Sequence, residues 1–271
     1  MSILFSGDFH AGSRGELDLI TKETLLSVYS EEIYKGIKYH IILGDGGFGW
    51  QQNTENDKRN YDILSKRPFL VLCVQGNHEP IYGMKNVEEK DISLGETVLM
   101  INKNPFVAYL KRGKVYMIDS IKFLVLGGAL SIDKYRRIEN KTWWKNEYWS
   151  KKEKDDLFKL LETDNTFDCV ISHTGPWHIN VKLFHYYYPL STGGNYDKVN
   201  DKVAKLNDEI HKKINFREWW AGHYHDDVYH YCKNLKHSYQ YLYDTTKIME
   251  KIKNKLKVYN EEGLMRKPYK E

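Results

Sequence analysis

Short apolar runs alternate with amphipathic segments in the first part of the chain. The runs at Ile3–Ser6, His40–Leu43 and Phe69–Val74 have the length and composition of buried strands. Between them, Leu17–Lys35 carries apolar residues at four-residue spacing, which is typical of one helix face, and Asp57–Ser65 is a second helical segment. This alternation of strands and helices predicts a parallel α/β sheet.

The middle and the end of the chain contain more strands at closer spacing. Turn residues separate three short apolar runs, at Phe106–Tyr109, Val115–Asp119 and Lys122–Leu126, which indicates a meander. The later predicted elements are helices over Lys152–Glu162 and Val199–Lys213, strands over Asp168–Ser172, Trp219–Gly222, Val228–Tyr231 and Tyr239–Tyr243, and a basic helix over Thr246–Val258. We therefore predict one domain with two joined sheets over residues 1–245, followed by a basic helical tail over residues 246–271.

The composition excludes several classes of protein. Of the 271 residues, 41% are hydrophobic and 29% are charged, which argues against a largely disordered chain. The net charge of +4 is too small to imply a nucleic-acid or membrane partner by itself. Three cysteines do not suggest a disulfide framework, and no apolar run approaches the roughly 20 residues that span a bilayer. Since the N-terminus also lacks the features of a secretory signal, we expect a cytoplasmic protein.

Polar side chains that can bind a metal follow five of the predicted strands. In chain order these blocks are Asp8-Phe9-His10, Gly44-Asp45, Gly76-Asn77-His78-Glu79, His173 and Gly222-His223-Tyr224-His225. Each block alone is common as a polar turn, but the carboxyl ends of parallel strands are where ligands gather in α/β sheets. Imidazole and carboxylate together suit Mn, Fe or Zn, and seven candidate ligands suit two ions that share a bridge. The five blocks together therefore predict a dinuclear metal site.

The order of these blocks resembles that of the calcineurin-like metallophosphoesterases. Their pattern is Asp-x-His, Gly-Asp, Gly-Asn-His-Glu/Asp, a lone His and Gly-His-x-His, and the resemblance here runs from Asp8 to His225. It implies an α/β (α+β) fold, a four-layer αββα sandwich with two mixed β-sheets face to face and helices outside. It also implies a hydrolase with a dinuclear metal site at the carboxyl ends of the strands.

The resemblance assigns a role to each candidate ligand. It implies that the first metal is held by Asp8, His10 and His225, that the second is held by Asn77, His173 and His223, and that Asp45 bridges both. Two cations about 3.5–4 Å apart repel each other, so an anionic bridge between them is favoured. A solvent molecule bound to both cations would become the hydroxide that attacks phosphorus directly. We therefore expect two divalent ions, Mn, Fe, Zn or Mg, with manganese favoured.

His78 is the predicted catalytic residue, because the resemblance implies that its side chain faces the substrate and does not bind a metal. Two roles are open: it could donate a proton to the leaving alkoxide, or it could stabilise charge on the phosphoryl group. Glu79 is a candidate to orient an imidazole, and Asp226 or Asp227 could do the same for the last histidine pair.

The second block departs from the protein-phosphatase branch of the family. In that branch, Gly-Asp is followed by Asp-Arg-Gly, whose arginine binds phosphate. Here, Gly44-Asp45 is followed by a glycine-rich segment that contains Phe48 and Trp50. Those two aromatic residues could stack on a nucleobase, although packing in the core is favoured. Arg136 or Arg137 could replace the missing cation at phosphate.

Other aromatic residues and histidines carry weaker signals. Trp143, Trp144 and Trp149 are predicted to pack in the core or in a lid, and His178 is predicted to be structural. The sequence does not decide whether residues 143–195 form a lid.

These observations favour a metal-dependent phosphoesterase whose substrate is a phosphate ester. A phosphodiesterase acting on a nucleotide or nucleic acid is slightly preferred, because Asp-Arg-Gly is missing. The alternatives are a protein or small-molecule phosphomonoesterase and, less favoured, a non-catalytic metal-binding interaction protein. We expect no membrane partner, and the sequence does not indicate an oligomeric state.

Overall fold

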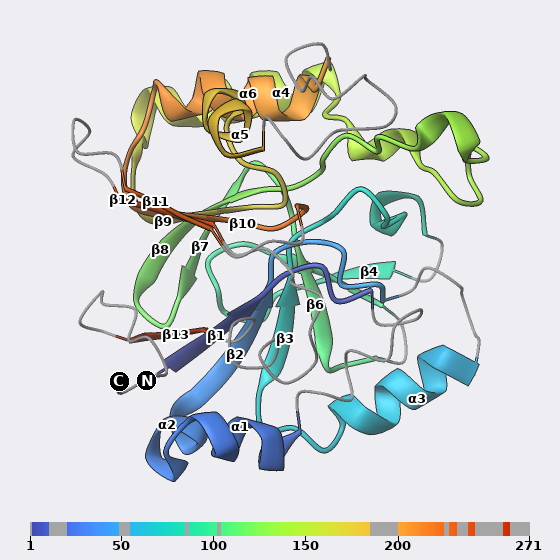
Figure 1. Ribbon diagram of the computed structural model, residues 1–271, viewed down its shortest axis with the longest axis vertical. Coiled ribbons are helices and arrows are strands. Elements are labelled where there is room, and N and C mark those ends of the chain that lie inside the picture. The colour runs from blue at the N-terminus through green and yellow to red at the C-terminus, as the bar shows by residue number, and fades with distance from the viewer. Residues whose placement is uncertain are drawn as a thin grey trace.

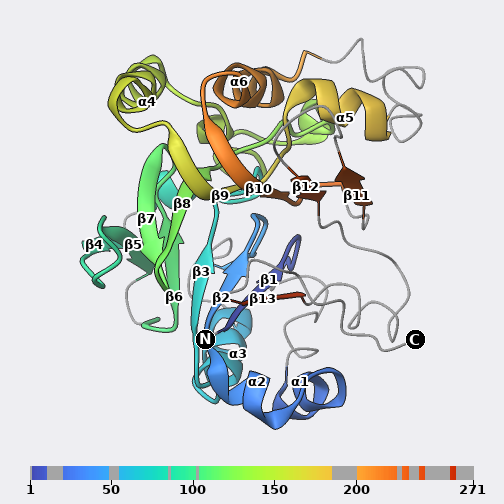
Figure 2. The same cartoon turned by 90° about the vertical axis from the view of Figure 1, so that its left-hand side faces the viewer.

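Two β-sheets stack face to face, and helices cover the outer side of each sheet (Figures 1 and 2). The computed structural model describes residues 2–10, 21–48, 55–84, 87–101, 104–184, 200–224, 228–231, 238–241 and 257–260. The four-layer sandwich that the sequence predicts is confirmed. Within the described ranges, no helix has the length and apolar character needed to cross a membrane.

The first sheet has seven strands and contains both parallel and antiparallel pairs. Its strands are, in spatial order, β13 (Lys257–Asn260), β1 (Ser2–Ser6), β2 (Ile37–Ile42), β3 (Leu70–Cys73), β6 (Val107–Leu110), β5 (Val98–Ile101) and β4 (Val87–Lys90). The strands β1, β2, β3 and β6 run parallel, so their carboxyl ends lie at one edge of the sheet. The hairpin β4–β5 was not predicted, because its strands lack a clear alternating pattern.

Three helices cover the outer face of this sheet: α1 (Lys22–Val28), α2 (Glu31–Gly36) and α3 (Glu55–Leu64). The sequence predicted one helix over residues 17–35, but the structure divides this region at Ser30. The backbone of Ser30 is extended, and its hydroxyl accepts a hydrogen bond from the Ile33 amide at 3.3 Å. Serine favours such N-cap positions over helix interiors, so a new helix begins after it.

The second sheet has four strands and carries its own outer helices. Its order is β10 (Asn215–Ala221), β9 (Thr166–Ser172), β8 (Ile121–Leu126) and β7 (Lys114–Ile118). The outer helices are α4 (Lys151–Thr163), α5 (Trp177–Phe184) and α6 (Lys202–His211). A small antiparallel pair, β11 (Val228–Tyr231) and β12 (Ser238–Tyr241), completes the described strands. Helix α5 was not predicted, since Gly175-Pro176 directly before it is typical of a loop.

Large aromatic side chains fill the space between the two sheets. The rings of Phe5 and Trp220 stack with their centroids 4.7 Å apart, and both side chains are fully buried. Tyr116 and Phe123 are buried in the same cluster. Burial of each such side chain stabilises the fold by about 1.5–3 kcal/mol. This packing fixes β1 of the first sheet against β10 of the second, and both strands end in a predicted ligand block.

The last described strand replaces part of the predicted basic tail. Lys257 and Val258, which the sequence assigns to a helix, belong to β13, which pairs antiparallel with β1. The rest of that predicted helix, residues 246–256, lies outside the described residues. Val258 and Tyr259 are residue types that favour strands, and β13 supplies the missing hydrogen-bond partner on the open side of β1.

Candidate metal centre

Loops that follow β1, β2, β3, β9 and β10 meet at the carboxyl ends of the parallel strands. Backbone hydrogen bonds join them: the amide of His10 donates to the carbonyl of Asp45 at 2.7 Å, and the amide of Gly222 donates to that of His173 at 2.9 Å. One ligand atom of each of Asp8, Asp45 and His173 lies within 4.8 Å of the others, and all three residues are buried. The structure thus brings together blocks that are far apart in the sequence.

Asp45 lies at the centre of this cluster. Its Oδ2 is 3.5 Å from Nε2 of His173, 3.7 Å from Nε2 of His78 and 3.8 Å from Nε2 of His10. Burial raises the pKa of the Asp45 carboxyl, but the nearby imidazoles of His78 and His173 outweigh burial and hold the pKa well below its usual range. Asp45 is therefore an anion surrounded by imidazole nitrogens.

His173 is fully buried and has a fixed orientation. Its Nδ1 donates to the carbonyl oxygen of Leu43 at 2.8 Å, because a carbonyl can only accept. Its Nε2 therefore faces Oδ1 of Asn77, 2.9 Å away, and Oδ2 of Asp45. Burial opposes protonation of this ring, but the Asp45 carboxylate raises the pKa of His173 to about 9. The groups around Nε2 thus favour the positively charged form of the His173 ring.

The side-chain amide of Asn77 is oriented by a short chain of hydrogen bonds. The hydroxyl of Ser131 donates to the Glu147 carboxylate at 2.6 Å, and its oxygen accepts from Nδ2 of Asn77 at 3.0 Å. With Nδ2 engaged, Oδ1 must point toward His173. Sequence analysis did not detect Ser131 or Glu147, because neither belongs to a ligand block and they lie 16 positions apart.

The donor set fits a divalent metal ion. When His173 is neutral, the lone pair of its Nε2, the Oδ1 atom of Asn77 and the Oδ2 atom of Asp45 face one another with no proton between them. Such a group of electron-pair donors is favourable only around a shared cation. The hydrogen bond from His173 to Leu43 also fixes the ligating tautomer, as is usual for metal-bound histidine.

Four of the predicted ligand residues have an uncommon backbone conformation. The φ angle is 53° at Asp8, 44° at His10, 50° at Asp45 and 80° at His223. Residues other than glycine rarely adopt positive φ, which costs on the order of 1–3 kcal/mol each and is concentrated at functional sites. Hydrogen bonds hold these turns, since Asp8 Oδ2 accepts from the His223 amide at 2.7 Å and Asp45 Oδ1 accepts from the His78 amide at 3.0 Å.

Two glycines of the motif allow the loops to approach this closely. A Cβ atom at Gly76 would overlap the carboxylate of Asp45, and a Cβ atom at Gly44, where φ is 88°, would overlap the ring of His173. Glycine is therefore required at both positions by the side chain of a neighbouring block.

Glu79 supports the backbone of the site through three hydrogen bonds, all from backbone amides or a tyrosine hydroxyl. Its carboxylate accepts from the amide of Gly76 at 2.6 Å, the amide of Gly47 at 3.1 Å and the hydroxyl of Tyr109 at 2.9 Å. Burial and the charge of Asp45 raise the pKa of Glu79 to about 7. The predicted role of orienting an imidazole is thus replaced by a role in joining the second and third blocks.

Most of the predicted site residues lie in this cluster. The structure brings together Asp8, His10, Asp45, Asn77, His78, His173 and His223, and the ring of His223 is 5.0 Å from that of His173. His225, Asp226, Asp227 and Trp50 lie outside the described residues. Phe48 is 2% exposed, which agrees with packing in the core.

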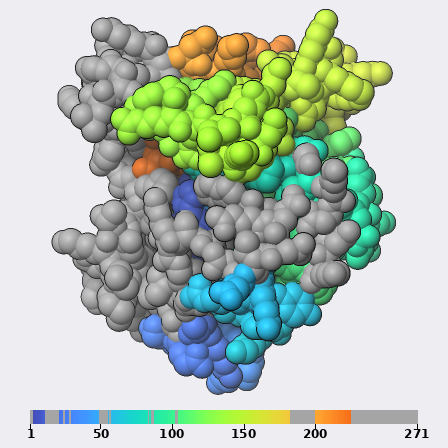
Figure 3. All heavy atoms as spheres, turned by 90° about the vertical axis from the view of Figure 1, so that its right-hand side faces the viewer, coloured from blue at the N-terminus to red at the C-terminus, as the bar shows by residue number. Residues whose placement is uncertain are grey.

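The two arginines predicted to bind phosphate have different positions. Arg136 is exposed and lies over the ring of Tyr135. Arg137 reaches the site, where its Nη1 lies 2.8 Å from Nδ1 of His78 and its guanidinium pairs with Asp133. The segment between β8 and α4, which carries both, appears in light green in Figure 3, near dark blue atoms of the N-terminal part of the chain.

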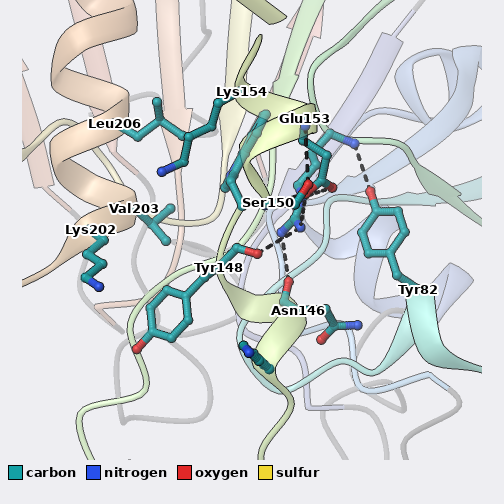
Figure 4. A pocket seen from close by; sticks show the side chains of 12 residues that line it. Tyr82, Asn146, Tyr148, Ser150, Glu153, Lys154, Lys202, Val203 and Leu206 are labelled. Atoms are coloured by element: carbon teal, nitrogen blue, oxygen red, sulfur yellow. Dashed lines mark hydrogen bonds and ion pairs between the residues drawn. The ribbon is translucent and has the colours of Figure 1, made fainter. Parts of the chain in front are cut away.

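A separate cavity of about 640 Å³ lies between this segment and helices α4 and α6 (Figure 4). Arg112 forms part of its wall and pairs with Glu153 at 2.8 Å. The same guanidinium donates to Oε1 of Gln75 at 3.2 Å and to the carbonyl of Asn146 at 2.8 Å. Gln75 directly precedes the Gly76-Asn77 block, so Arg112 joins the wall of this cavity to a loop of the metal centre.

Predicted packing roles for other aromatic and histidine residues agree with the structure. Trp143 and Trp149 are 5% and 6% exposed. His178 is paired with Asp208, and its ring lies 5.0 Å from that of His211, outside the metal cluster.

No protein-family model matches this chain, and none of the curated proteins matches it. Its structure is similar to that of a phosphopantetheinyl hydrolase from Mycobacterium tuberculosis, with 13% identity, a TM-score of 0.46 and coverage of 89% of this chain and 88% of that one. A dimetal phosphatase from Danio rerio has 12% identity, a TM-score of 0.45 and coverage of 95% and 91%. A putative 5'-nucleotidase from Staphylococcus aureus has 13% identity and a TM-score of 0.42, over 98% of this chain and 52% of that one.

Proposed function

We propose that this chain is a metallophosphoesterase of the calcineurin-like type, an enzyme that hydrolyses a phosphate ester with two divalent cations. The observation that carries the proposal is the environment of Asp45. Its buried carboxylate has the Nε2 atoms of three histidines within 3.8 Å, at the carboxyl ends of the strands. Imidazoles and carboxylates in one buried cluster are the ligands of borderline divalent metals.

The proposed ligands follow the pattern of the family that the sequence resembles. Asp8, His10 and His225 would hold one metal, Asn77, His173 and His223 would hold the other, and Asp45 would bridge them. The short distances among Asp8, Asp45 and His173 support this assignment, as does the orientation of Asn77. The assignment of His225 rests on the sequence pattern alone.

Each residue of the cluster has a defined task in the proposed reaction. Two bound cations would acidify a solvent molecule and neutralise the charge of the phosphate oxygens. Asp45 keeps three imidazoles together, because its carboxylate lies within 3.8 Å of His10, His78 and His173. Asn77 is a neutral ligand, so it limits the negative charge that an entering phosphate ester meets. His78 presents Nε2 to the same space and is the proposed catalytic residue.

For the substrate, we place a phosphodiester of the nucleotide or nucleic-acid type first. The absence of Asp-Arg-Gly after Gly44-Asp45 supports this choice over a phosphoprotein. A protein or small-molecule phosphomonoester is the alternative. Manganese as the metal and a cytoplasmic location are further predictions that rest on the sequence.

The experiment is a pair of rates measured on purified protein with Mn²⁺. The rate on bis(p-nitrophenyl) phosphate is divided by the rate on p-nitrophenyl phosphate, and the metal content is measured by mass spectrometry. A ratio well above one supports the diesterase, and a ratio well below one supports the monoesterase. Metal bound at the site without turnover of either ester would favour the non-catalytic alternative, and a protein that binds no metal would overturn the proposal.

A further inference from the structure

Arg137 and His78 form a direct contact at the edge of the metal centre. Nη1 of Arg137 lies 2.8 Å from Nδ1 of His78, whereas the distance from Nη2 to Nε2 of the same ring is 3.5 Å. The shorter contact has the length of a good hydrogen bond, and the longer one does not. The ring therefore meets the guanidinium through Nδ1 and leaves Nε2 toward Asp45, whose Oδ2 is 3.7 Å away.

Arg137 is held in place by its other contacts. Its Nε and Nη2 atoms donate to the two carboxylate oxygens of Asp133, each at 2.6 Å, and Nη1 also donates to the carbonyl of Thr142 at 2.9 Å. With the contact to His78, four of the five donors of the guanidinium are engaged. Two parallel donors would be free to bind a phosphate only if the pair with Asp133, the contact with His78 or the hydrogen bond to Thr142 broke.

The direction of this hydrogen bond decides where the proton of His78 lies. An arginine guanidinium has no acceptor and stays protonated, so it can only donate. Nδ1 of His78 must then accept and carries no hydrogen, which places the hydrogen of the ring on Nε2. The charged groups that face the ring are the guanidinium on the Nδ1 side and the Asp45 carboxylate on the Nε2 side, with the ring of His10 5.4 Å away.

We infer that Asp133 and Arg137 position His78 as a neutral imidazole whose Nε2–H is a hydrogen-bond donor to the phosphoryl group, and that His78 does not protonate the leaving group. This inference rests on the proposed function and decides between the two roles that the sequence left open for His78. A neutral ring that gave up its Nε2 proton would become an anion, which makes it a poor acid. A fixed N–H aimed at developing charge needs no proton transfer.

The reaction remains balanced without a proton from His78. The bond from the attacking solvent oxygen to phosphorus forms as the bond from phosphorus to the leaving oxygen breaks. The leaving oxygen takes its proton from solvent, and His78 keeps its Nε2–H throughout. Arg137 is thus a positioning residue that acts through His78, in place of the phosphate clamp predicted from the sequence.

The first test reads the tautomer directly and needs no activity. In ¹⁵N-histidine-labelled protein loaded with Zn²⁺, the signals of the His78 ring are identified by their loss in His78→Asn. We expect one protonated nitrogen, Nε2, and one unprotonated nitrogen, Nδ1, in the wild-type ring. We expect that pattern to change in Arg137→Met and to stay in Arg217→Met, a remote arginine that pairs with Asp168. A wild-type ring protonated at both nitrogens, or at Nδ1 alone, would overturn the inference.

The second test uses a series of aryl phosphate esters whose leaving groups differ in pKa. If His78 is only a donor to the phosphoryl group, His78→Asn should lower kcat by about 10²-fold for every ester, with an unchanged slope against leaving-group pKa. A slope that becomes steeper in the variant would show that His78 protonates the leaving group, and the inference would be wrong. If no ester is hydrolysed at all, the proposed function fails, while the ring spectrum still decides the tautomer.

The kinetics of Arg137→Met distinguish positioning from substrate binding. We expect kcat to fall by about tenfold or more with KM changed less than about twofold, because the side chain acts on His78 and not on the ester. Asp133→Asn should give a smaller loss of the same kind, and the double variant should be no worse than Arg137→Met alone. A large rise in KM with kcat unchanged would instead assign Arg137 to the phosphate.

Discussion

The Asp45 carboxylate accepts a hydrogen bond from the backbone amide of His78 at 3.0 Å, while its second oxygen faces three imidazoles. One side chain therefore sets the geometry of the second and third ligand blocks together. We expect Asp45→Asn to abolish turnover, by at least about 10³-fold, because the amide keeps the shape but lacks the charge that a bridge between two cations needs.

The measurement is kcat/KM with Mn²⁺, together with the metal content and the circular dichroism spectrum. The matched control is Asp156→Asn, since Asp156 is an exposed aspartate that pairs only with Lys152 in the described contacts. The control should retain full activity. Activity of Asp45→Asn within a few-fold of the wild type would contradict the proposed bridge.

Gly76 is a second position that should not tolerate substitution, because a single added Cβ atom would change both stability and metal binding. Its Cβ atom would overlap the Asp45 carboxylate, whereas a Cβ atom at Gly95, which has a φ of 90°, would meet nothing within 4 Å. We expect Gly76→Ala to lower the free energy of unfolding by about 2 kcal/mol or more and to weaken metal binding. Gly95→Ala adds the backbone strain of a positive φ, which Gly76 does not have, but it creates no overlap. A larger loss of stability in Gly76→Ala than in Gly95→Ala, measured by urea unfolding, therefore reports the overlap. Equal effects on both would mean that the loop at Gly76 can move aside.

Ser131 should control metal binding without being a ligand. Removing its hydroxyl frees Nδ2 of Asn77, so the side-chain amide can turn and offer a nitrogen where an oxygen is needed. We expect Ser131→Ala to weaken metal binding by about 10–100-fold, which is the usual effect of losing such an orienting partner. Calorimetric titration with Mn²⁺ measures this, with Ser65→Ala as a control whose hydroxyl bonds only a local carbonyl. Unchanged affinity in Ser131→Ala would show that Asn77 is held by other contacts.

Glu218 should make stability depend on pH. Burial raises the pKa of Glu218 from 4.5 to about 7 in the folded chain, so between those values the folded state binds more protons than the unfolded state. The contribution of Glu218 to stability is therefore greatest below pH 4.5 and falls as pH rises to 7, by up to about 3 kcal/mol. Glu218→Gln stays neutral and should remove this loss, which urea unfolding of metal-free protein at pH 5 and pH 8 measures. Glu55→Gln, on an exposed helix position, should leave the difference between the two pH values as in the wild type.

That Asp8, Asp45 and His173 lie together could be predicted from the sequence because the signal is local. Each ligand block directly follows an apolar run, and the parallel strands carry those ends to one edge of the sheet. The break at Ser30 was missed because the apolar spacing continues through it, and only the cap geometry reveals two helices.

Contacts between distant segments could not be predicted in the same way. Glu147 reaches Asn77 through Ser131, and Arg137 reaches His78 over 59 positions, with no pattern in the sequence that joins these residues. The pair of Asp133 and Arg137 is different, because residues four positions apart can be recognised in a sequence as a possible ion pair, and this spacing was not used in predicting a phosphate-binding arginine.

The pairing of β13 with β1 has a consequence for how the protein is made. The outer hydrogen-bond partner of residues 2–5 is supplied by residues 257–260, so this edge of the sheet stays open until residue 260 has left the ribosome. Contacts so far apart in sequence form slowly, because a long loop must close before they add stability. During synthesis, the strand that leads into Asp8 is therefore the part of the nascent sheet that is most exposed to pairing with another chain.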